Sequence, residues 1–309
     1  MAMVSIVMTT YNGEKYLTEQ LDSILSSVYH DFDLYIYDDG SSDATMEILN
    51  QYQSRYQDQI YIVQNKENKG VTLNFLHGIS RTTSDYIMLC DQDDVWKQNK
   101  IAQTLKRIRQ MEAQEGKDIP MAVFTDAQVV DKDLKILQAS FFCSSHLNPK
   151  KTDLSHMLME NKLIGCTVMM NAALRKILQS HLMPKAARFH DGWIGLIAAS
   201  FGKIGFVNEG TLLYRQHGVN LVGNTSFTSY MKNRITSLKT QKEALLALQN
   251  QAEEFLMIYQ ELLSERNQQI LECFGNLHRM PPMKRRIIIM KYGYWKTGII
   301  RNAGLMFLI

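Results

Sequence analysis

The sequence predicts an α/β fold built on a mostly parallel sheet, and this prediction depends on two observations. Between residues 4 and 126, short runs rich in Ile, Val, Tyr and Phe alternate with longer amphipathic stretches. The short runs have the length and composition of strands, whereas the longer stretches repeat their apolar residues at helical spacing. Strands and helices in regular succession indicate parallel strands joined by crossover helices, with ligands bound at the carboxyl ends of the strands.

The elements of this N-terminal half follow in order. The predicted strands are residues 4–9, 34–37, 60–63, 86–90 and 121–125. The predicted helices are residues 14–27, 43–56, 71–79 and 97–111. Asp43 is a candidate N-cap for the second helix, because an Asp side chain accepts hydrogen bonds from the first free N–H groups of a helix.

The pattern changes twice after Asp126. Residues 131–150 are polar and irregular; we then predict strands at 163–170, 203–207 and 211–215 and helices at 172–180 and 191–201. From residue 230 to 274 there is no Pro or Gly, which favours one or two long helices. We therefore expect an α/β domain at 1–225, with halves 1–126 and 127–225, followed by a helical region at 226–309 that supplies a possible homodimer contact.

Composition excludes several classes of protein. The chain has 309 residues, 45% of them hydrophobic and 21% charged, which excludes a disordered or collagen-like chain. No apolar run approaches the ~18–20 residues of a spanning helix, and the N-terminus does not resemble a secretory signal. Cys90, Cys143, Cys166 and Cys273 form no C-x-x-C pair, so we expect reduced thiols in a cytoplasmic protein.

Charge is concentrated in the C-terminal tail. Residues 279–309 contain seven Lys and Arg and no acidic residue, which leaves 27 basic against 31 acidic residues, a net −4, in the rest of the chain. An acidic body argues against nucleic-acid binding. The tail mixes its cations with Ile, Tyr, Trp and Phe, so we expect it to lie at the inner face of the plasma membrane. The alternative is a basic tail that packs its apolar residues on the body.

Three carboxylates, those of Asp91, Asp93 and Asp94, directly follow the strand at 86–90. Like charges this close are unfavourable unless a cation neutralises them, and Mg²⁺ or Mn²⁺ prefers oxygen ligands. On an extended chain Asp91 and Asp93 would point the same way and share one ligand. The alternative is a solvated acidic turn before the next helix. An EF-hand is excluded because Trp96 stands where that loop needs glycine.

Two further strand ends carry polar side chains. Asp38 and Asp39 follow the strand at 34–37, before a turn at Gly40, and a carboxylate there would accept hydrogen bonds from a nucleotide base or ribose. Residues 9–13, T-T-Y-N-G, add hydroxyl groups and a turn. Neither G-x-G-x-x-G nor a P-loop is present, so a nucleotide would be bound through carboxylates and a metal ion.

Together, T-T-Y-N-G at 9–13, D-D-G-S-S-D at 38–43 and D-Q-D-D at 91–94 resemble the family 2 inverting glycosyltransferases. The resemblance covers residues 3–220 and implies a GT-A fold, in which a nucleotide-binding half joins an acceptor half. It implies that Asp39 contacts the base, that Asp91 lies near the ribose or metal, and that Asp93 binds the metal and bridges to the diphosphate. Thr9 and Tyr11 are then also nucleotide-binding residues.

Two later segments are similar to motifs of the same family. R-F-H-D-G-W at 188–193 resembles its acceptor-side motif, whose aspartate, here Asp191, is the general base; a carboxylate can remove the proton of an attacking sugar hydroxyl. The alternative is that Asp191 only caps the helix at 191–201. His190, Trp193 and Trp96 would then lie on the acceptor side, the two indoles stacking on a sugar or, alternatively, packing in the core.

The segment Y-R-Q-H-G-V-N at 214–220 resembles the family's late histidine motif, which implies that His217 joins the metal and Arg215 lies near the phosphates. The whole motif set looks most like bacterial polysaccharide rhamnosyltransferases, which use dTDP-β-L-rhamnose and lipid-linked acceptors; a UDP-hexose is the alternative donor. Two other functions stay open: an aspartate-nucleophile phosphatase, because D-Q-D-D-V fits D-x-D-x-[TV], and a non-catalytic scaffold built on the C-terminal helices.

Overall fold

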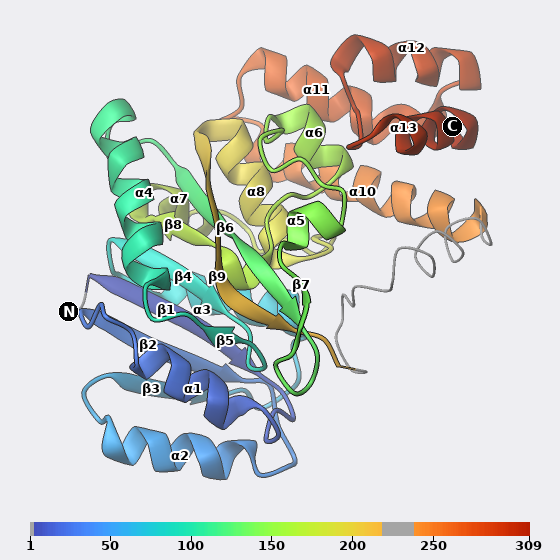
Figure 1. Cartoon of the computed structure of the whole chain (residues 1–309). Coiled ribbons are helices and arrows are strands. Elements are labelled where there is room, and N and C mark those ends of the chain that lie inside the picture. Colours follow the sequence, from blue (N-terminus) through green and yellow to red (C-terminus); the bar gives the residue numbers. More distant parts are fainter. Residues whose placement is uncertain (1–2, 218–237) are drawn as a thin grey trace.

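The computed structural model describes residues 3–217 and 238–309, which form one mixed sheet covered by helices on both faces (Figure 1). The strand order is β3-β2-β1-β4-β8-β6-β9-β5, with β7 paired to β6. The strands are β1 (Val4–Thr10), β2 (Phe32–Asp38), β3 (Ile60–Gln64), β4 (Tyr86–Cys90), β5 (Val95–Trp96), β6 (Met121–Val130), β7 (Ile136–Gln138), β8 (Met169–Asn171) and β9 (Lys203–Arg215).

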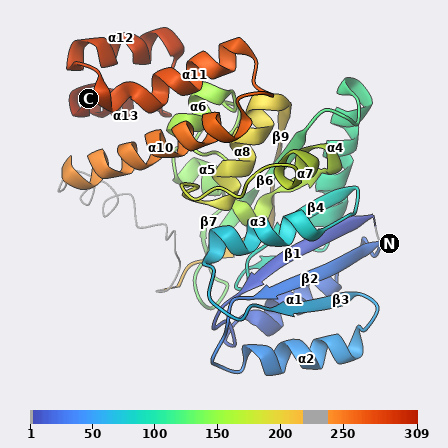
Figure 2. The same cartoon turned by 180° about the vertical axis from the view of Figure 1, so that it is seen from behind.

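Alternating side chains explain why helices cover both faces of the parallel strands. Ile6 and Met8 of β1 share a buried cluster with α1 (Leu17–Leu25), α2 (Thr45–Arg55) and α4 (Lys100–Glu115). Val7 points to the opposite face of the sheet and packs with α3 (Val71–Arg81). Figure 2 shows the molecule from this side, with α3 in front of the sheet. Three further helices on this side are α6 (Leu154–Met159), α7 (Ala172–Gln179) and α8 (His190–Phe201), with the short α5 (Phe141–Ser144) beside β6.

The predicted parallel half is confirmed, because β3, β2, β1 and β4 are adjacent and parallel in the order that crossover helices require. The predicted strand at 163–170 is wrong for most of its length. Gly165–Thr167 forms a 3₁₀ turn (η1), and only Met169–Asn171 pairs, antiparallel to both β4 and β6. The strands predicted at 203–207 and 211–215 are one continuous strand, β9.

The N-cap of α2 is Ala44 rather than the predicted Asp43. The Asp43 carboxylate still stabilises this region, because it accepts hydrogen bonds from the Thr45 N–H at 3.0 Å and from the Glu14 N–H at 3.1 Å. The second bond joins the loop before α1 to the loop before α2.

The C-terminal helices pack on the α8 side of the sheet and share its core. They are α10 (Leu238–Tyr259), α11 (Glu265–Gly275), the 3₁₀ turn η2 (Asn276–Arg279), α12 (Pro282–Tyr292) and α13 (Ile299–Leu308). Phe255 and Tyr259 of α10 contact Trp193 of α8, and Tyr294 and Leu305 are buried in the same cluster. The helices predicted from residue 230 are confirmed from Leu238 onward; residues 230–237 lie outside the described residues.

Polar contacts also hold the tail on the body. Buried Glu160 accepts hydrogen bonds from the Thr297 N–H at 2.9 Å and the Thr297 hydroxyl at 2.7 Å, and it forms ion pairs with Lys162 and Arg301. The alternative that the tail packs on the body therefore holds for one face of its helices. None of the helices within residues 3–217 and 238–309 has the length and apolarity needed to cross a membrane.

Candidate active site

The carboxyl ends of β1, β2 and β4 form one edge of the sheet, because β1 pairs with β2 on one side and β4 on the other. The loops at these ends are joined by direct hydrogen bonds. The Tyr11 N–H donates to Gln92 Oε1 at 2.8 Å, and Gln92 Nε2 donates to the Tyr11 carbonyl at 3.1 Å. An added Cβ at Gly13 would lie 2.4 Å from Gln92 Oε1, so a larger residue at this position would displace the Gln92 side chain. The first and third predicted motifs therefore meet.

Asp38 and Asp39 are adjacent in sequence but have different roles. Asp38 is fully buried and accepts hydrogen bonds from the Thr10 hydroxyl at 2.9 Å and the Ser41 N–H at 2.9 Å, so it fixes the turn after β2. This supplies the structural role for Asp38 that the sequence did not reveal.

Asp39 is held by the loop after β3. Its carboxylate accepts hydrogen bonds from Asn65 Nδ2 at 2.8 Å and from the N–H groups of Lys69 at 2.9 Å and Gly70 at 2.8 Å. These bonds fix the orientation of the carboxylate at the edge of the sheet. Contact with a base by Asp39 stays a prediction, as do nucleotide contacts by Tyr11, whose side chain is exposed, and by Thr9, which is largely buried at the end of β1.

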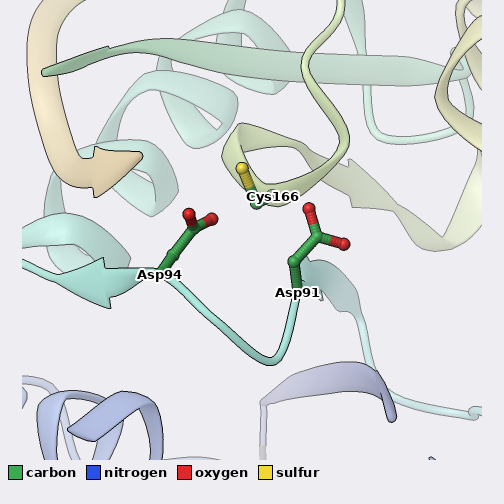
Figure 3. Close-up of side chains that lie close together, drawn as sticks. All are labelled: Asp91, Asp94 and Cys166. Atoms are coloured by element: carbon green, nitrogen blue, oxygen red, sulfur yellow. The ribbon is translucent and has the colours of Figure 1, made fainter. Parts of the chain in front are cut away.

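Residues 91–94 form a bend, so the expectation that Asp91 and Asp93 point the same way is wrong. Asp91 and Asp94 instead converge, with their ligand atoms and the Cys166 thiol all within 4.8 Å of one another (Figure 3). Asp93 points elsewhere, and its Oδ2 lies 2.7 Å from Nε2 of His217. The four acidic and imidazole groups thus form two pairs around the bend, not one row.

The acidic cluster is strained electrostatically. Burial raises the pKa of Asp91 well above its usual range, and the charges of Asp94, Asp93 and Asp191 raise it further. Burial and the charge of Asp93 raise the pKa of Asp94 to about 7. Asp94 Oδ2 is buried and has no hydrogen-bond partner among the residues that the structure describes. The cluster is therefore short of positive charge.

A hard divalent cation fits this donor set. Asp91, Asp93 and Asp94 offer carboxylate oxygens, and His217 offers an imidazole nitrogen next to Asp93. The thiol of Cys166 is the odd donor, but burial, with the charges of Asp94 and Asp91, raises its pKa well above the usual range. Mg²⁺ and Mn²⁺ prefer oxygen ligands whereas thiolates suit softer metals, so the carboxylates and the imidazole are the groups that would hold Mg²⁺ or Mn²⁺.

The Arg215 side chain is buried and contacts other residues of the site. Its guanidinium is buried, donates from Nε to the Asp93 carbonyl at 2.9 Å, pairs with Glu19 and lies over the Tyr16 ring at 4.5 Å. Its backbone N–H donates to Asp94 Oδ1 at 3.1 Å. The predicted contact of Arg215 with phosphate is therefore corrected: the side chain fixes the bend that carries Asp93 and Asp94. Tyr16 also stacks on His217, with ring centroids 4.8 Å apart.

Asp191 opens helix α8 and faces the acidic cluster, since its charge contributes to the raised pKa of Asp91. Its carboxylate accepts hydrogen bonds from the N–H groups of Gly165 at 3.1 Å and Gly192 at 2.6 Å. Burial raises the pKa of Asp191 to about 6, against the opposing effect of these N–H groups and the Asn161 side chain. A carboxylate that has a pKa of about 6 and is held in one orientation by hydrogen bonds has the properties of a general base.

The three other residues predicted on the acceptor side are buried. Trp193 is fully buried against Phe255 and Tyr259, and Trp96 is buried with the Lys100 ammonium 4.7 Å from its ring centre. His190 stacks on Phe75 at 3.9 Å, and burial lowers its pKa to about 3, so it is neutral. Stacking of these indoles on a sugar is therefore corrected to core packing, and His190, the first residue of α8, packs on Phe75 of α3.

Several site residues were missed because the sequence gives them no chemical signal. Gln92 joins two motifs although it was only the spacer of D-Q-D-D, and Asn65 and Gly70 orient Asp39 from a loop with no motif. Gly165 reaches Asp191 because it has no side chain: an added Cβ would lie 2.6 Å from His190 Nε2. Gln92 and Gly13 lie in segments that the motifs had already marked, so their contact joins two predicted motifs.

Comparisons with known proteins identify the family of the chain. The sequence matches the family description "Glycosyl transferase family 2" over residues 5–180. The putative glycosyltransferase EpsE of Bacillus subtilis is 42% identical over 92 residues, which are 30% of this chain and 33% of that protein. The poly(ribitol-phosphate) beta-glucosyltransferase of Bacillus spizizenii is 26% identical over 174 residues, 52% of this chain and 26% of that protein. The chain thus spans a third or less of the length of these two relatives.

Solved structures share the fold. S. aureus TarS 1–349 in complex with UDP-GlcNAc superposes with a TM-score of 0.58 at 17% identity, covering 94% of this chain and 79% of that one. The mannosyltransferase PcManGT from Pyrobaculum calidifontis in complex with GDP-Man and Mn²⁺ gives a TM-score of 0.55 at 14% identity, covering 98% and 78%. Neither the phosphatase nor the scaffold alternative is supported. With a family match over more than half of its length and the GT-A fold, the chain belongs to glycosyltransferase family 2.

Proposed function

We propose that the protein is an inverting glycosyltransferase that moves a sugar from a nucleoside diphosphate to a hydroxyl group of an acceptor. The observation that carries this proposal is the position of Asp191, a half-buried carboxylate whose pKa is raised to about 6 by desolvation and whose charge acts on Asp91 in the acidic cluster after β4. A base close to a cation-binding cluster is what a single displacement needs, because one removes the proton of the attacking hydroxyl and the other compensates the charge of the leaving group.

In the proposed reaction, Asp191 accepts the proton of the acceptor hydroxyl as that oxygen attacks the anomeric carbon. The bond between the anomeric carbon and the diphosphate oxygen breaks on the opposite side, so the anomeric configuration inverts. The N–H groups of Gly165 and Gly192 hold the Asp191 carboxylate in one orientation throughout. Asp39, fixed by Asn65 and Gly70, would orient the base of the donor.

The leaving diphosphate needs compensation for its charge. Asp91 and Asp94, whose carboxylates converge, would hold a Mg²⁺ or Mn²⁺ ion together with the neighbouring pair of Asp93 and His217, and the ion would supply that positive charge when bound. Metal dependence is also favoured by the unpartnered Asp94 oxygen and by the raised pKa values in the cluster.

For the donor we propose dTDP-L-rhamnose, on the resemblance of the motif set to rhamnosyltransferases, with a UDP-hexose as the alternative. For the acceptor we propose a lipid-linked glycan of a cell-surface or capsular polysaccharide. The relative named for poly(ribitol-phosphate) glucosylation supports a surface polymer as the general class. The alternative of a UDP-linked donor is supported by the structure of TarS, which was solved in complex with UDP-GlcNAc.

A thermal-shift panel of UDP-, dTDP- and GDP-sugars, each with and without Mn²⁺, tests the donor and the metal together. We expect stabilisation by one nucleotide class only when Mn²⁺ is present. If no nucleotide sugar changes the melting temperature with or without the ion, the proposal fails. Within the transfer assay, Asp93→Ala should abolish product formation while the protein stays folded, and normal turnover by this variant would remove Asp93 from the metal site.

A further inference from the structure

Helix α13 turns an apolar face to solvent. Its exposed residues include Ile299, Ile300 and Phe307, which are 89%, 76% and 79% exposed, together with Ala303 and Gly304. The spacing of these five residues places them on one side of the helix. The opposite side is anchored, because Leu305 and Ile309 are buried in the core. Large side chains at this exposure, gathered on one face of one helix, indicate a surface that is covered in use.

The face is held in a fixed orientation. Arg301 pairs with the buried Glu160, and Asn302 exchanges hydrogen bonds with Lys296 at 2.8 and 2.9 Å, which fixes the start of α13. Helix α12 lies beside α13 in both views, and Arg286 Nε donates to the Met306 carbonyl at 3.0 Å (Figures 1 and 2). The apolar face is therefore not a frayed end that could fold back onto the body.

The charge around this face identifies its partner. Helix α12 exposes Lys284 and Lys291 among Met283, Ile287 and Met290, and residues 279–309 contain seven basic and no acidic residues. A second copy docked by twofold symmetry would bring these cations against the same cations of its partner. An anionic bilayer instead attracts the cations and accepts the apolar side chains.

We propose that the exposed face of α13, with the lysines of α12 beside it, is a docking surface for a bilayer that contains anionic lipid. Ile299, Ile300 and Phe307 enter the region between headgroups and acyl chains, and Lys284 and Lys291 stay at the headgroups with their stems lying along the apolar layer. This inference extends the proposed transfer to a lipid-linked acceptor, because it gives the enzyme a way to stay at the surface where such an acceptor lies.

Vesicle co-sedimentation of the full chain tests the surface without any sugar donor. The vesicles are phosphatidylcholine alone and phosphatidylcholine with about a third phosphatidylglycerol. We expect binding to the anionic vesicles that weakens with added salt. Ile300→Ser and Phe307→Ser should each reduce it by about tenfold, because each removes a side chain from the apolar layer.

Leu182→Ser is the matched control, because Leu182 is also 76% exposed but lies outside the C-terminal helices. It should bind like the wild type, and the melting temperatures of all variants should agree. The proposal is overturned if the wild type binds neither kind of vesicle, or if Leu182→Ser loses as much binding as Ile300→Ser. It is also overturned if the protein is a dimer that does not bind vesicles and Phe307→Ser converts this dimer to a monomer.

The proposed docking surface and the proposed reaction can be tested separately. Asp191→Asn should lose transfer and still bind vesicles, whereas Ile300→Ser should lose vesicle binding and still transfer sugar to a water-soluble acceptor. Failure of vesicle binding with normal transfer therefore rejects only the docking surface, and failure of transfer with normal vesicle binding rejects only the reaction.

Discussion

The two sides of the acidic cluster are built in different ways. On one side, Asp39 and Asp91 follow β2 and β4, the two strands that flank β1, and the loops at the ends of β1 and β4 are joined by hydrogen bonds within the first 92 residues. Asp93, in contrast, is held by His217 and by Arg215, which donates to its carbonyl. On the other side, Asp191 is oriented by Gly165 and Asn161, and Asn161 follows Glu160, which binds Thr297 and Arg301 of the tail. The orientation of Asp39 is therefore determined within the N-terminal half, whereas Asp93 and the base are positioned by contacts with segments later in the chain.

The largest test of this contrast is Asp191→Asn, which keeps the shape of the side chain but removes the base. We expect the rate of transfer to fall by about 10²–10⁴-fold, since that is the usual contribution of a positioned general base. Donor binding in the thermal-shift assay should be unchanged, because Asp39 and the acidic cluster are intact. Asp133→Asn, on the exposed side of the β6–β7 turn, is the control and should transfer at the normal rate. Wild-type turnover by Asp191→Asn would leave the base unassigned.

The dependence of the base side on the tail predicts a large stability effect for Glu160→Ala. Removing this buried carboxylate leaves Lys162 and Arg301 without their common partner, which should cost about 3–5 kcal/mol of unfolding free energy. Urea denaturation measures the change. Glu115→Ala is the matched control, because Glu115 pairs with Lys203 at 3.7 Å on the surface, and it should cost at most about 1 kcal/mol. Equal losses for the two variants would contradict the proposed importance of the Glu160 contacts.

The pH dependence of transfer separates the two sides kinetically. Burial raises the pKa of Asp191 to about 6, and only the deprotonated carboxylate can accept a proton. The value of kcat/KM should therefore fall by about tenfold per pH unit on the acid side of this pKa. A bound divalent cation would shift this fall in kcat/KM to lower pH, because positive charge favours the deprotonated carboxylate of Asp191 and lowers its pKa. A rate that is flat down to pH 4 would argue against Asp191 as the base.

The smallest predicted effect concerns stability on the donor side. Burial raises the pKa of Asp94 to about 7, so the folded metal-free protein binds more protons than the unfolded chain between about pH 4 and pH 7. Its unfolding free energy should therefore decrease as pH rises through this window, by the linkage relation. Mn²⁺ at about 100 times its dissociation constant should restore about 2.7 kcal/mol at neutral pH. Asp94→Asn should make the slope less steep without abolishing it, because Asp91 and Asp191 also have raised pKa values. An unchanged slope in that variant would place the effect elsewhere.

Much of the donor side was predictable because its rules are local. A buried parallel strand ends at a known edge, so Asp39 and Asp91 could be placed together from the sequence alone. The pairing within the acidic group was not predictable, since the bend at 91–94 turns Asp93 toward His217 and Asp91 toward Asp94. Arg215 was misassigned for a related reason: its motif does not reveal that Glu19, Tyr16 and the Asp93 carbonyl surround its guanidinium.

The amino-acid sequence by itself determined the parallel half of the sheet, the strand ends that carry carboxylates, and the excess of cations in the tail, because periodicity, strand length and charge are properties of short segments. Only the tertiary structure decided that Trp96 and Trp193 are core residues, that Asp191 is held by Gly165, and that α13 keeps one apolar face outward. The burial of a side chain and its hydrogen-bond partners depend on segments that are far apart in the chain. The sequence of each segment does not reveal which distant segment it contacts.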